Sequence, residues 1–213
     1  EKVVNTGMFE KYKIEKIFGL HTKQNMPVGT IAIAPGPFSA AVDRFLYAVK
    51  GMGCHGSAPQ TGLDPIPAAA RLVGSLQEIV SRRISPTETA VISVTRFTSG
   101  TSWNIIPETA RLEGTVRTFN PKVREQIVKL MQAQAEGLER EGYQVEFTWI
   151  PGCPATNNDA DLAELVRKEA MEEGFHVTLQ HPEMGGEDFS CYQELVPGAF
   201  FHVGTGGKYP AHN

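Results

Sequence analysis

The sequence predicts an α/β protein whose chain is interrupted by a ferredoxin-like α+β domain at residues 42–154. Two observations lead to this prediction. First, the middle of the chain has the order strand, helix, strand, strand, helix, strand, which is the split βαβ arrangement of one antiparallel sheet with both helices on one face. Second, the flanking residues 1–41 and 155–213 contain short apolar strands and an amphipathic helix, a combination typical of an α/β domain.

The elements of the predicted insert follow from hydrophobic periodicity. Apolar and polar side chains alternate over residues 42–50, which indicates a strand. Leu72, Leu76 and Ile79 then recur at helical spacing after Pro65, and a proline suits a helix start because its missing N–H costs little there. The remaining predicted elements are strands at residues 89–97, 110–119 and 143–150, a loop at 98–109 that is too long for a tight hairpin, and a helix from Pro121 to Gly142.

The two flanks supply strands that are apolar enough to be buried on both faces. Residues 14–21 and 28–36 are predicted strands before the insert, and residues 199–207 form an apolar strand that runs into glycines. Between the insert and this last strand, residues 161–174 have the pattern of an amphipathic helix. Because buried strands with interleaved helices flank the insert, the two flanks are expected to build one α/β domain together.

Composition excludes two broad classes of function. The chain has 213 residues, 41% of them hydrophobic, and a formal net charge of -4 with acids and bases interspersed, so a nucleic-acid partner is not expected. No apolar run is long enough to span a membrane. Cys54, Cys153 and Cys191 are widely scattered, which fits reduced thiols in a cytoplasmic protein better than a disulfide framework. Because the chain starts at Glu1 without a methionine and stops soon after a glycine-rich loop, we expect truncation at both ends.

Four loops carry polar groups that could serve chemistry, and each lies at the end of a predicted element. They contain His21, His55, Glu187 and His212. A histidine on a glycine-rich turn is well placed to meet a ligand, although local sequence alone favours an incidental surface turn for His55. Likewise, His21 alone fits a satisfied buried histidine, and Glu187 alone fits an acid favoured by a helix N-terminus.

The other titratable residues are weaker candidates. His176, His181 and His202 lack such settings, and we interpret them as structural or surface residues. Cys54 precedes His55 directly, which suggests a thiol nucleophile beside a base. Adjacent residues on a turn usually diverge, so a thiol hydrolase that uses Cys54 is a minor alternative.

Several motifs, in order along the chain, resemble those of a known enzyme family. They are "FGLH", "KGMGCHGSAP", "GLDPI", "WNIIPE", "EGTVRTF", "GGEDF", "GTGG" and "HN". Together they cover essentially the whole chain, whereas any one of them alone would be unspecific. The set is similar to that of the N-acyl-amino-acid amidohydrolases in the aminoacylase and carboxypeptidase superfamily, which includes hippurate hydrolases and indole-acetyl-amino-acid hydrolases.

The resemblance implies a metallopeptidase-like catalytic domain, residues 1–41 and 155–213, interrupted by a ferredoxin-like lid, residues 42–154, that also forms a homodimer. It implies two divalent metal ions with His21 and His212 among their ligands, and zinc, manganese, cobalt and nickel all suit imidazole. The family's other ligands, a Cys-x-His pair and two adjacent glutamates of which one is the general base, would lie upstream of this chain.

The resemblance also implies roles for four residues outside the metal ligands. His55 would reach across the dimer into the neighbouring active site and stabilise the oxyanion that forms as water attacks the amide. Asn104 and Arg117 would bind the substrate carboxylate, which matches the planar fork of a guanidinium. Glu187 would help to position the site. Without the motifs, Asn104 would be interpreted as a turn residue and Arg117 as a member of an exposed ion pair.

These implications define the expected function. The complete protein would be a metal-dependent hydrolase that cleaves the amide of an N-acyl amino acid, or of a short peptide-like substrate, to a carboxylic acid and a free amino acid. The 213-residue chain by itself would be inactive, because it holds only part of the ligand set. The alternative is a non-catalytic ferredoxin-like module for ligand binding or dimerisation, since that fold serves many functions.

Overall fold

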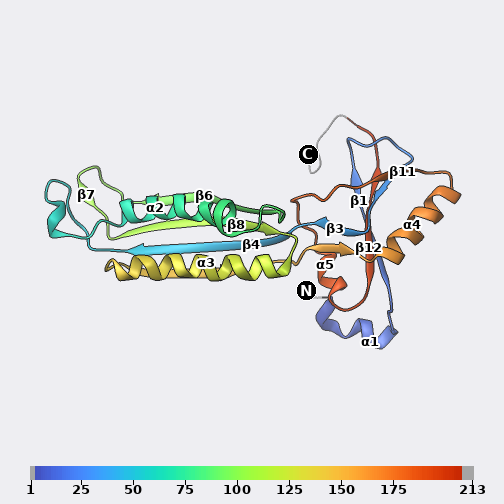
Figure 1. Ribbon diagram of the computed structural model, residues 1–213, viewed down its shortest axis with the longest axis horizontal. Helices are drawn as coiled ribbons and strands as arrows, with labels where there is room; N and C mark the ends of the chain where they lie inside the picture. The colour runs from blue at the N-terminus through green and yellow to red at the C-terminus, as the bar shows by residue number, and fades with distance from the viewer. Residues whose placement is uncertain (1–2, 208–213) are drawn as a thin grey trace. The chain divides into compact units, whose positions relative to one another are not determined.

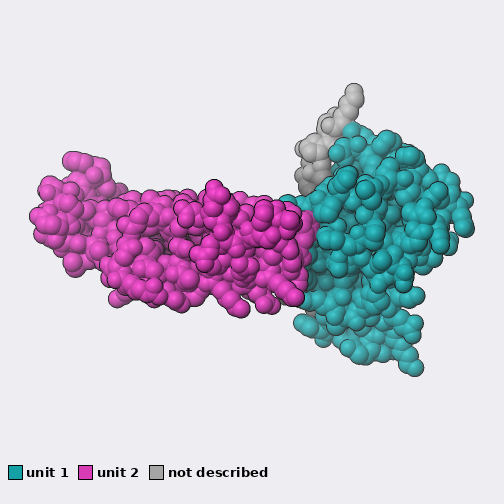
Figure 2. Space-filling model, viewed as in Figure 1, with its two compact units in different colours: residues 1–41, 153–213 teal, residues 42–152 magenta. Residues whose placement is uncertain are grey.

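The computed structural model describes residues 3–207, and the chain divides into two compact units (Figure 1, Figure 2). Residues 42–152 form one unit, and residues 1–41 together with 153–213 form the other. The two flanks, although far apart in the sequence, therefore fold together. Within residues 3–207, no helix is both long enough and apolar enough to cross a membrane.

The unit of residues 42–152 has the ferredoxin-like strand order that the sequence predicts. Its elements are β4 (Ala41–Lys50), β5 (Cys54–His55), α2 (Pro65–Glu78), β6 (Ala90–Ser99), β7 (Ile105–Ile106), β8 (Thr109–Thr118), α3 (Pro121–Arg140) and β9 (Gln144–Ile150). The sheet order is β6-β8-β4-β9, with antiparallel pairing of β4 to β9 and of β6 to β8. The first strand thus lies between the third and the fourth, which is the split βαβ arrangement.

Local sequence explains where both helices of this unit begin. The side chain of Asp64 caps α2, and Pro65 occupies the first helical position. The side chain of Asn120 caps α3 in the same way, and Pro121 follows it. Each cap satisfies one backbone N–H that the first turn would otherwise leave without a partner. After α3, Gly142 has a φ of 98°, a left-handed conformation that favours glycine.

Both helices pack on one face of the sheet and share a single core. Side chains alternate along β8, so every second residue enters this core and the others, including Glu113 and Arg117, lie on the opposite face. Tyr47 is buried at the centre, where its hydroxyl donates to the carbonyl oxygen of Met131 at 2.8 Å, and burial raises its pKa. The largest buried side chains of this core include Phe45, Tyr47, Leu72, Leu76, Ile79, Leu112, Ile127 and Met131.

The other unit is built on a mixed sheet in the order β1-β12-β2-β11. Its elements are α1 (Met8–Tyr12), β1 (Ile17–Lys23), β2 (Thr30–Ile33), β3 (Gly36–Ser39), β10 (Thr156–Asn158), α4 (Ala160–Glu172), β11 (His176–Leu179), α5 (Ser190–Gln193) and β12 (Gly198–Gly204). β1 is parallel to β12 and β11 is parallel to β2, whereas β12 and β2 are antiparallel. α4 packs on this sheet around Leu162 and Ala163.

Short elements are the part of this fold that the sequence analysis missed. The strands predicted at 14–21, 28–36 and 199–207 and the helix predicted at 161–174 are present with bounds shifted by a few residues. By contrast, β3, β10 and β11 span only three or four residues each, which is too short for a periodic pattern. The loop predicted at 98–109 also contains the two-residue strand β7.

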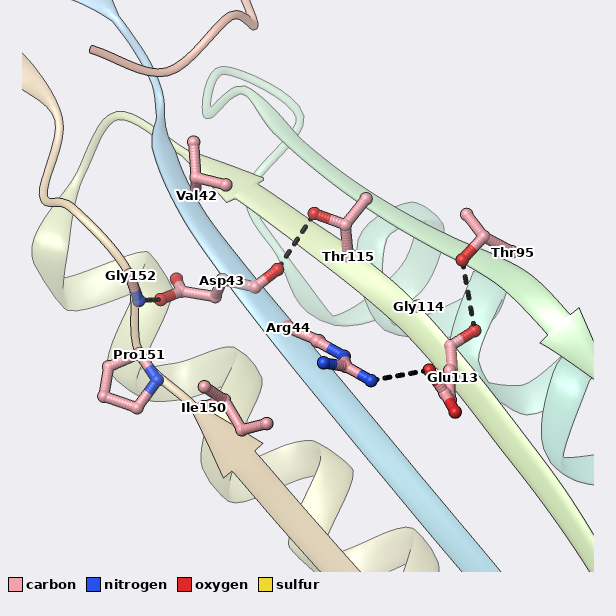
Figure 3. Close-up of a pocket in the computed structure, with 10 residues that line it drawn as sticks. All are labelled: Val42, Asp43, Arg44, Thr95, Glu113, Gly114, Thr115, Ile150, Pro151 and Gly152. Atoms are coloured by element: carbon pink, nitrogen blue, oxygen red, sulfur yellow. Dashed lines mark hydrogen bonds and ion pairs between the residues drawn. The ribbon is translucent and has the colours of Figure 1, made fainter. Parts of the chain in front are cut away.

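A buried carboxylate joins the two ends of the unit of residues 42–152. The side chain of Asp43 is fully buried and accepts a hydrogen bond from Nε of Arg124 at 2.8 Å and from the backbone N–H of Gly152 at 3.0 Å. Figure 3 shows the carboxylate of Asp43 facing Gly152. A Cβ at position 152 would lie 2.0 Å from the carbonyl oxygen of Val42, so only glycine fits there. Asp43 therefore pins the entering and the leaving segment together.

Replacing Asp43 by asparagine should destabilise this unit by about 3 kcal/mol or more, because the guanidinium of Arg124 loses the charge that compensates its burial. Urea unfolding monitored by tryptophan fluorescence measures this, since both tryptophans, Trp103 and Trp149, lie in residues 42–152. The matched control is Arg44→Ala, which removes an exposed ion pair with Glu113 and should cost less than about 1 kcal/mol. Equal losses in the two variants would contradict the role of Asp43.

Candidate functional site

Two histidines lie side by side at one edge of the mixed sheet. β1 and β12 are parallel, so their carboxyl ends reach the same edge, and the register places His21 opposite His202. The ring centroids are 6.4 Å apart in an edge-to-face arrangement. The edge at the carboxyl ends of parallel strands is where α/β proteins commonly bind ligands. This edge is therefore the first candidate site.

The hydrogen bond of His21 suits a metal ligand. Its Nδ1 lies 2.8 Å from the carbonyl oxygen of Thr22, and a carbonyl can only accept, so Nδ1 carries the hydrogen. Nε2 of the neutral ring then has the lone pair. Histidines that bind metals usually donate their other ring N–H in this way, which fixes the tautomer and the ring orientation.

His202 belongs to the same edge, although the sequence analysis interpreted it as structural or surface. Its Nδ1 donates to Oε1 of Gln180 at 2.9 Å, and Nε2 of Gln180 donates to the carbonyl oxygen of His181, which orients the amide. Burial, and then the positive charge of Lys23, lower the pKa of His202 to about 4. His202 is thus neutral near pH 7. Only the pairing of β1 with β12 reveals its position beside His21.

A charged pair completes this edge. Lys23, at the end of β1, forms an ion pair with Glu183. Burial tends to raise the pKa of Glu183, but hydrogen bonds from Lys23 and Gln180 outweigh burial and lower it. Glu183 is therefore an anion at neutral pH. Through Gln180, this ion pair is connected to His202.

The "GGEDF" loop is anchored on the strand that carries His21. Phe189 is buried, and a Cβ at Gly19 would lie 2.6 Å from its ring, so the glycine of "FGLH" leaves room for this phenylalanine. Glu187 in the same loop is half-buried. Burial, reinforced by the neighbouring Asp188, raises the pKa of Glu187. The loop thus presents a carboxyl group that is easier to protonate than an exposed one.

In the other unit, a short ladder brings His55 and Asn104 to the same end. β5 and β7 are antiparallel and place His55 opposite Ile105. The N–H of Gly56 donates to the carbonyl oxygen of Asn104 at 2.8 Å. A Cβ at Gly56 would lie only 3.0 Å from that oxygen, which explains the glycine. We call this end of the unit, residues 52–57 and 102–106, the tip.

The polar side chains of the tip are held by two serines. Nδ1 of His55 lies 3.2 Å from the backbone N–H donor of Ser57 and 2.8 Å from its Oγ. The hydroxyl of Ser102 donates to Oδ1 of Asn104 at 2.8 Å. Cys54 precedes His55 on β5, and successive strand residues point to opposite faces, so the ladder separates the thiol from the imidazole. This geometry speaks against a Cys54–His55 pair.

Arg117 lies far from the tip within one chain. It is eight residues beyond the start of β8 at Thr109, which corresponds to roughly 26 Å along a strand. Within residues 3–207 no carboxylate forms an ion pair with Arg117, so the ion-pair interpretation of this residue lacks a partner. The structure therefore brings together His55 and Asn104 but leaves Arg117 apart from both.

A hollow of about 360 Å³ lies on the sheet face away from the helices (Figure 3). Its charged groups already have partners, because Glu113 bonds to Arg44 at 2.8 Å and to Arg96 at 3.3 Å. The hollow contains none of the site residues that the sequence predicts. It is lined by Val42, Asp43, Arg44, Thr95, Glu113, Gly114, Thr115, Ile150, Pro151 and Gly152.

The structure describes only part of the expected metal centre. His212 lies outside the described residues. In the part of the chain from residue 3 to residue 207, no cluster of three or more histidine, cysteine, aspartate or glutamate side chains could hold a metal ion. Of the two expected ligands, His21 alone can be compared with the structure, and its tautomer fits.

Comparison with known proteins gives a consistent result. A family model described as Peptidase family M20/M25/M40 matches residues 1–213. The chain is 41% identical over 213 residues to an N-acetylcysteine deacetylase of Bacillus subtilis, covering 100% of the chain and 56% of that protein. It is 33% identical over 216 residues to an N-acetyldiaminopimelate deacetylase of Bacillus pumilus, covering 100% of the chain and 57% of that protein.

A solved structure agrees with these sequence relatives. The Bacillus subtilis YXEP protein, described as a dinuclear metal-binding peptidase of the M20 family, matches with a TM-score of 0.84 and 38% identity. The match covers 100% of this chain and 54% of that one. The chain spans about half the length of the curated relatives it matches.

His202 should make the metal-free chain less stable as the pH falls. An unfolded histidine titrates near 6.5, whereas the pKa of folded His202 is about 4, so between these values the unfolded chain binds the proton more readily. The stabilising contribution is present above pH 6.5 and is lost towards pH 4. Thermal unfolding should therefore show that His202→Gln loses less stability than the original chain between pH 6.5 and pH 4. If the melting temperatures of the two proteins fall equally with pH, the lowered pKa of His202 is contradicted.

Proposed function

Because the chain belongs to peptidase family M20/M25/M40, we propose that the complete protein is a metal-dependent amidohydrolase of N-acyl amino acids. The observation that carries this proposal is His21, which lies near the carboxyl end of the parallel strand β1 with its Nδ1 bonded to a carbonyl and its Nε2 lone pair suited to a metal. The deacetylases among the relatives act on N-acetylcysteine and N-acetyldiaminopimelate. N-acetyl amino acids are thus the proposed substrate class.

His21 and His212 would hold two divalent metals together with residues outside this chain. Imidazole nitrogen suits zinc, manganese, cobalt and nickel. Such metals, when bound, activate water and polarise an amide carbonyl. Since two imidazoles do not make a closed metal site, the 213-residue chain alone is proposed to be inactive.

The remaining site residues are proposed to contact the substrate or to position the site. His55 donates a hydrogen bond to the oxyanion that develops as the amide carbonyl is attacked. Asn104 and Arg117 bind the carboxylate of the amino acid, for which the fork of the arginine is well shaped. Glu187, with its raised pKa, helps to position the site.

The separation of these residues supports a homodimer. His55 and Asn104 lie at the tip, whereas Arg117 lies roughly 26 Å along β8 from the start of that strand. An N-acetyl amino acid is far shorter than this distance, so His55 and Arg117 of one chain cannot contact the same substrate molecule. Two chains can, if the tip of one copy reaches the site of the other.

The direct test is an assay of the complete protein on N-acetyl amino acids. We expect turnover that requires added manganese or zinc and disappears with a chelator, whereas the 213-residue chain shows none. Turnover that survives chelation but is lost on alkylation of Cys54 would replace this proposal by a thiol hydrolase. If the protein binds N-acetyl amino acids and dimerises but shows no turnover, the alternative of a non-catalytic binding or dimerisation module is favoured.

Two substitutions should separate the roles of the tip and of β8. In the complete protein, His55→Ala should lower kcat by about a hundredfold, because an oxyanion donor acts on charge that appears only in the transition state. Arg117→Ala should mainly raise KM, because the substrate carboxylate is charged from the outset. Steady-state kinetics distinguish the two patterns, and a His55 variant with altered KM alone would contradict the oxyanion role.

Mixing inactive variants extends this test to the dimer. A His55→Ala chain and a His21→Ala chain, exchanged into heterodimers, should regain activity, because one site then combines an intact His21 with an intact His55 from the partner copy. Each variant reassembled alone is the control and should stay inactive. If activity fails to return after verified subunit exchange, His55 serves its own chain.

A further inference from the structure

The hydrogen bonds at the tip determine which atom of each polar side chain meets a ligand. Nδ1 of His55 faces both the backbone N–H and the hydroxyl of Ser57, at 3.2 and 2.8 Å. The turn that creates this contact is itself closed, because the N–H of Ala58 donates to the carbonyl oxygen of His55 at 2.8 Å. The imidazole is exposed, so its far side is open to a ligand.

The backbone N–H and the hydroxyl of Ser57 together favour one tautomer of His55. A backbone N–H can only donate, so this contact favours an Nδ1 that accepts and carries no hydrogen in the neutral ring. The hydroxyl of Ser57 can either donate or accept, and beside an accepting Nδ1 it donates. The hydrogen of the neutral imidazole is then on Nε2, which lies on the side away from Ser57.

Asn104 is oriented by the same kind of contact. Its Oδ1 accepts the hydroxyl hydrogen of Ser102 at 2.8 Å. The amide oxygen is therefore occupied within the tip, and the NH₂ group is the end that can meet a ligand. Asn104 and His55 come from segments about fifty residues apart in the sequence, yet each has a serine two residues away that bonds its accepting atom.

We propose that Ser57 and Ser102 are positioning residues that make the tip present only N–H donors, from Nε2 of His55 and the amide of Asn104, to an anionic oxygen. This inference rests on the proposed function, in which the ligand oxygens are the developing oxyanion and the substrate carboxylate. Both are acceptors, so a ring with its hydrogen on Nδ1, or an amide with its oxygen outward, would face them with a lone pair.

Within residues 3–207, two other histidines have defined side-chain bonds, and both have the opposite polarity. Nδ1 of His21 and Nδ1 of His202 both donate, to Thr22 and to Gln180, which leaves the lone pair on Nε2. That polarity suits a metal ion, which needs a lone pair. His55 has the opposite polarity, which suits an anion.

The tautomer can be observed directly in the 213-residue chain. Two-bond ¹H–¹⁵N correlation spectra, recorded where the rings are neutral, should show the hydrogen of His55 on Nε2 and that of His202 on Nδ1 as the internal reference. Ser57→Ala removes the hydroxyl donor and should increase the fraction of His55 with its hydrogen on Nδ1, whereas Ser57→Thr should restore the original pattern. A His55 ring with its hydrogen on Nδ1 in the original chain, or no change in Ser57→Ala, overturns the proposal.

Kinetics of the complete protein supply the second readout. Ser57→Ala should lower kcat by about fivefold, the rate change that corresponds to one ordinary hydrogen bond, with KM unchanged. Ser102→Ala should instead raise KM, because Asn104 binds the ground-state carboxylate. The matched control is Ser81→Ala, which should change neither value, because the hydroxyl of Ser81 bonds to the backbone carbonyl of Gln77, four residues earlier.

These experiments separate the failure of this inference from the failure of the proposed function. If His55→Ala leaves turnover unchanged, the catalytic role of His55 is wrong, and the tip is overturned as an oxyanion site whatever the spectra show. If His55→Ala is inactive but Ser57→Ala matches the original protein in both kcat and tautomer, the proposed function stands and the positioning role of Ser57 is overturned.

Discussion

The organisation of this chain depends on the hydrogen bonds that the buried carboxylate of Asp43 accepts. A domain inserted into another must begin and end at nearly the same point, and here one side chain bonds to Arg124 and to the N–H of Gly152. A buried charge is tolerated only when it is fully compensated, so this arrangement accepts few alternatives. The two segments lie in direct contact, and the carbonyl oxygen of Val42 therefore leaves no room for a side chain at position 152. The flanking residues can then share one sheet.

Within that sheet, close backbone and ring contacts determine where the functional loops lie. The missing side chain at Gly19 accommodates Phe189, and the ring of Phe189 packs with Phe38 and Phe200. These contacts attach the "GGEDF" loop to β1, the strand that carries His21. At the tip, Gly56 similarly allows the backbone near His55 to approach Asn104. Glycine at each of these positions therefore allows a close contact, and this contact fixes the position of the neighbouring polar residues.

The same residue type acquires opposite chemistry in the two units. A carbonyl beside Nδ1 of His21 leaves a lone pair on Nε2 of that ring. An N–H beside Nδ1 of His55 instead leaves the hydrogen of the neutral ring on Nε2. One ring is suited to a cation and the other to an anion. The choice is made by groups one or two residues along the chain, which are the carbonyl of Thr22 beside His21 and the N–H and hydroxyl of Ser57 beside His55.

Local pattern was enough to predict the order of the long strands and the helices in residues 42–152, because each of these is long enough to show a period and both helices begin at a cap followed by proline. The motifs were enough to suggest the family. The sequence could not show that His202 lies beside His21, that Asn104 and His55 share the tip, or that Arg117 lies far from the tip. Burial imposes a period within each strand, and that period is written in the sequence, whereas the register between distant strands and the hydrogen-bond partner of each ring exist only once the sheet has assembled. The sequence alone thus determined the long elements and most of the candidate residues, and the tertiary structure decided which residues lie together and which atom of each is bonded.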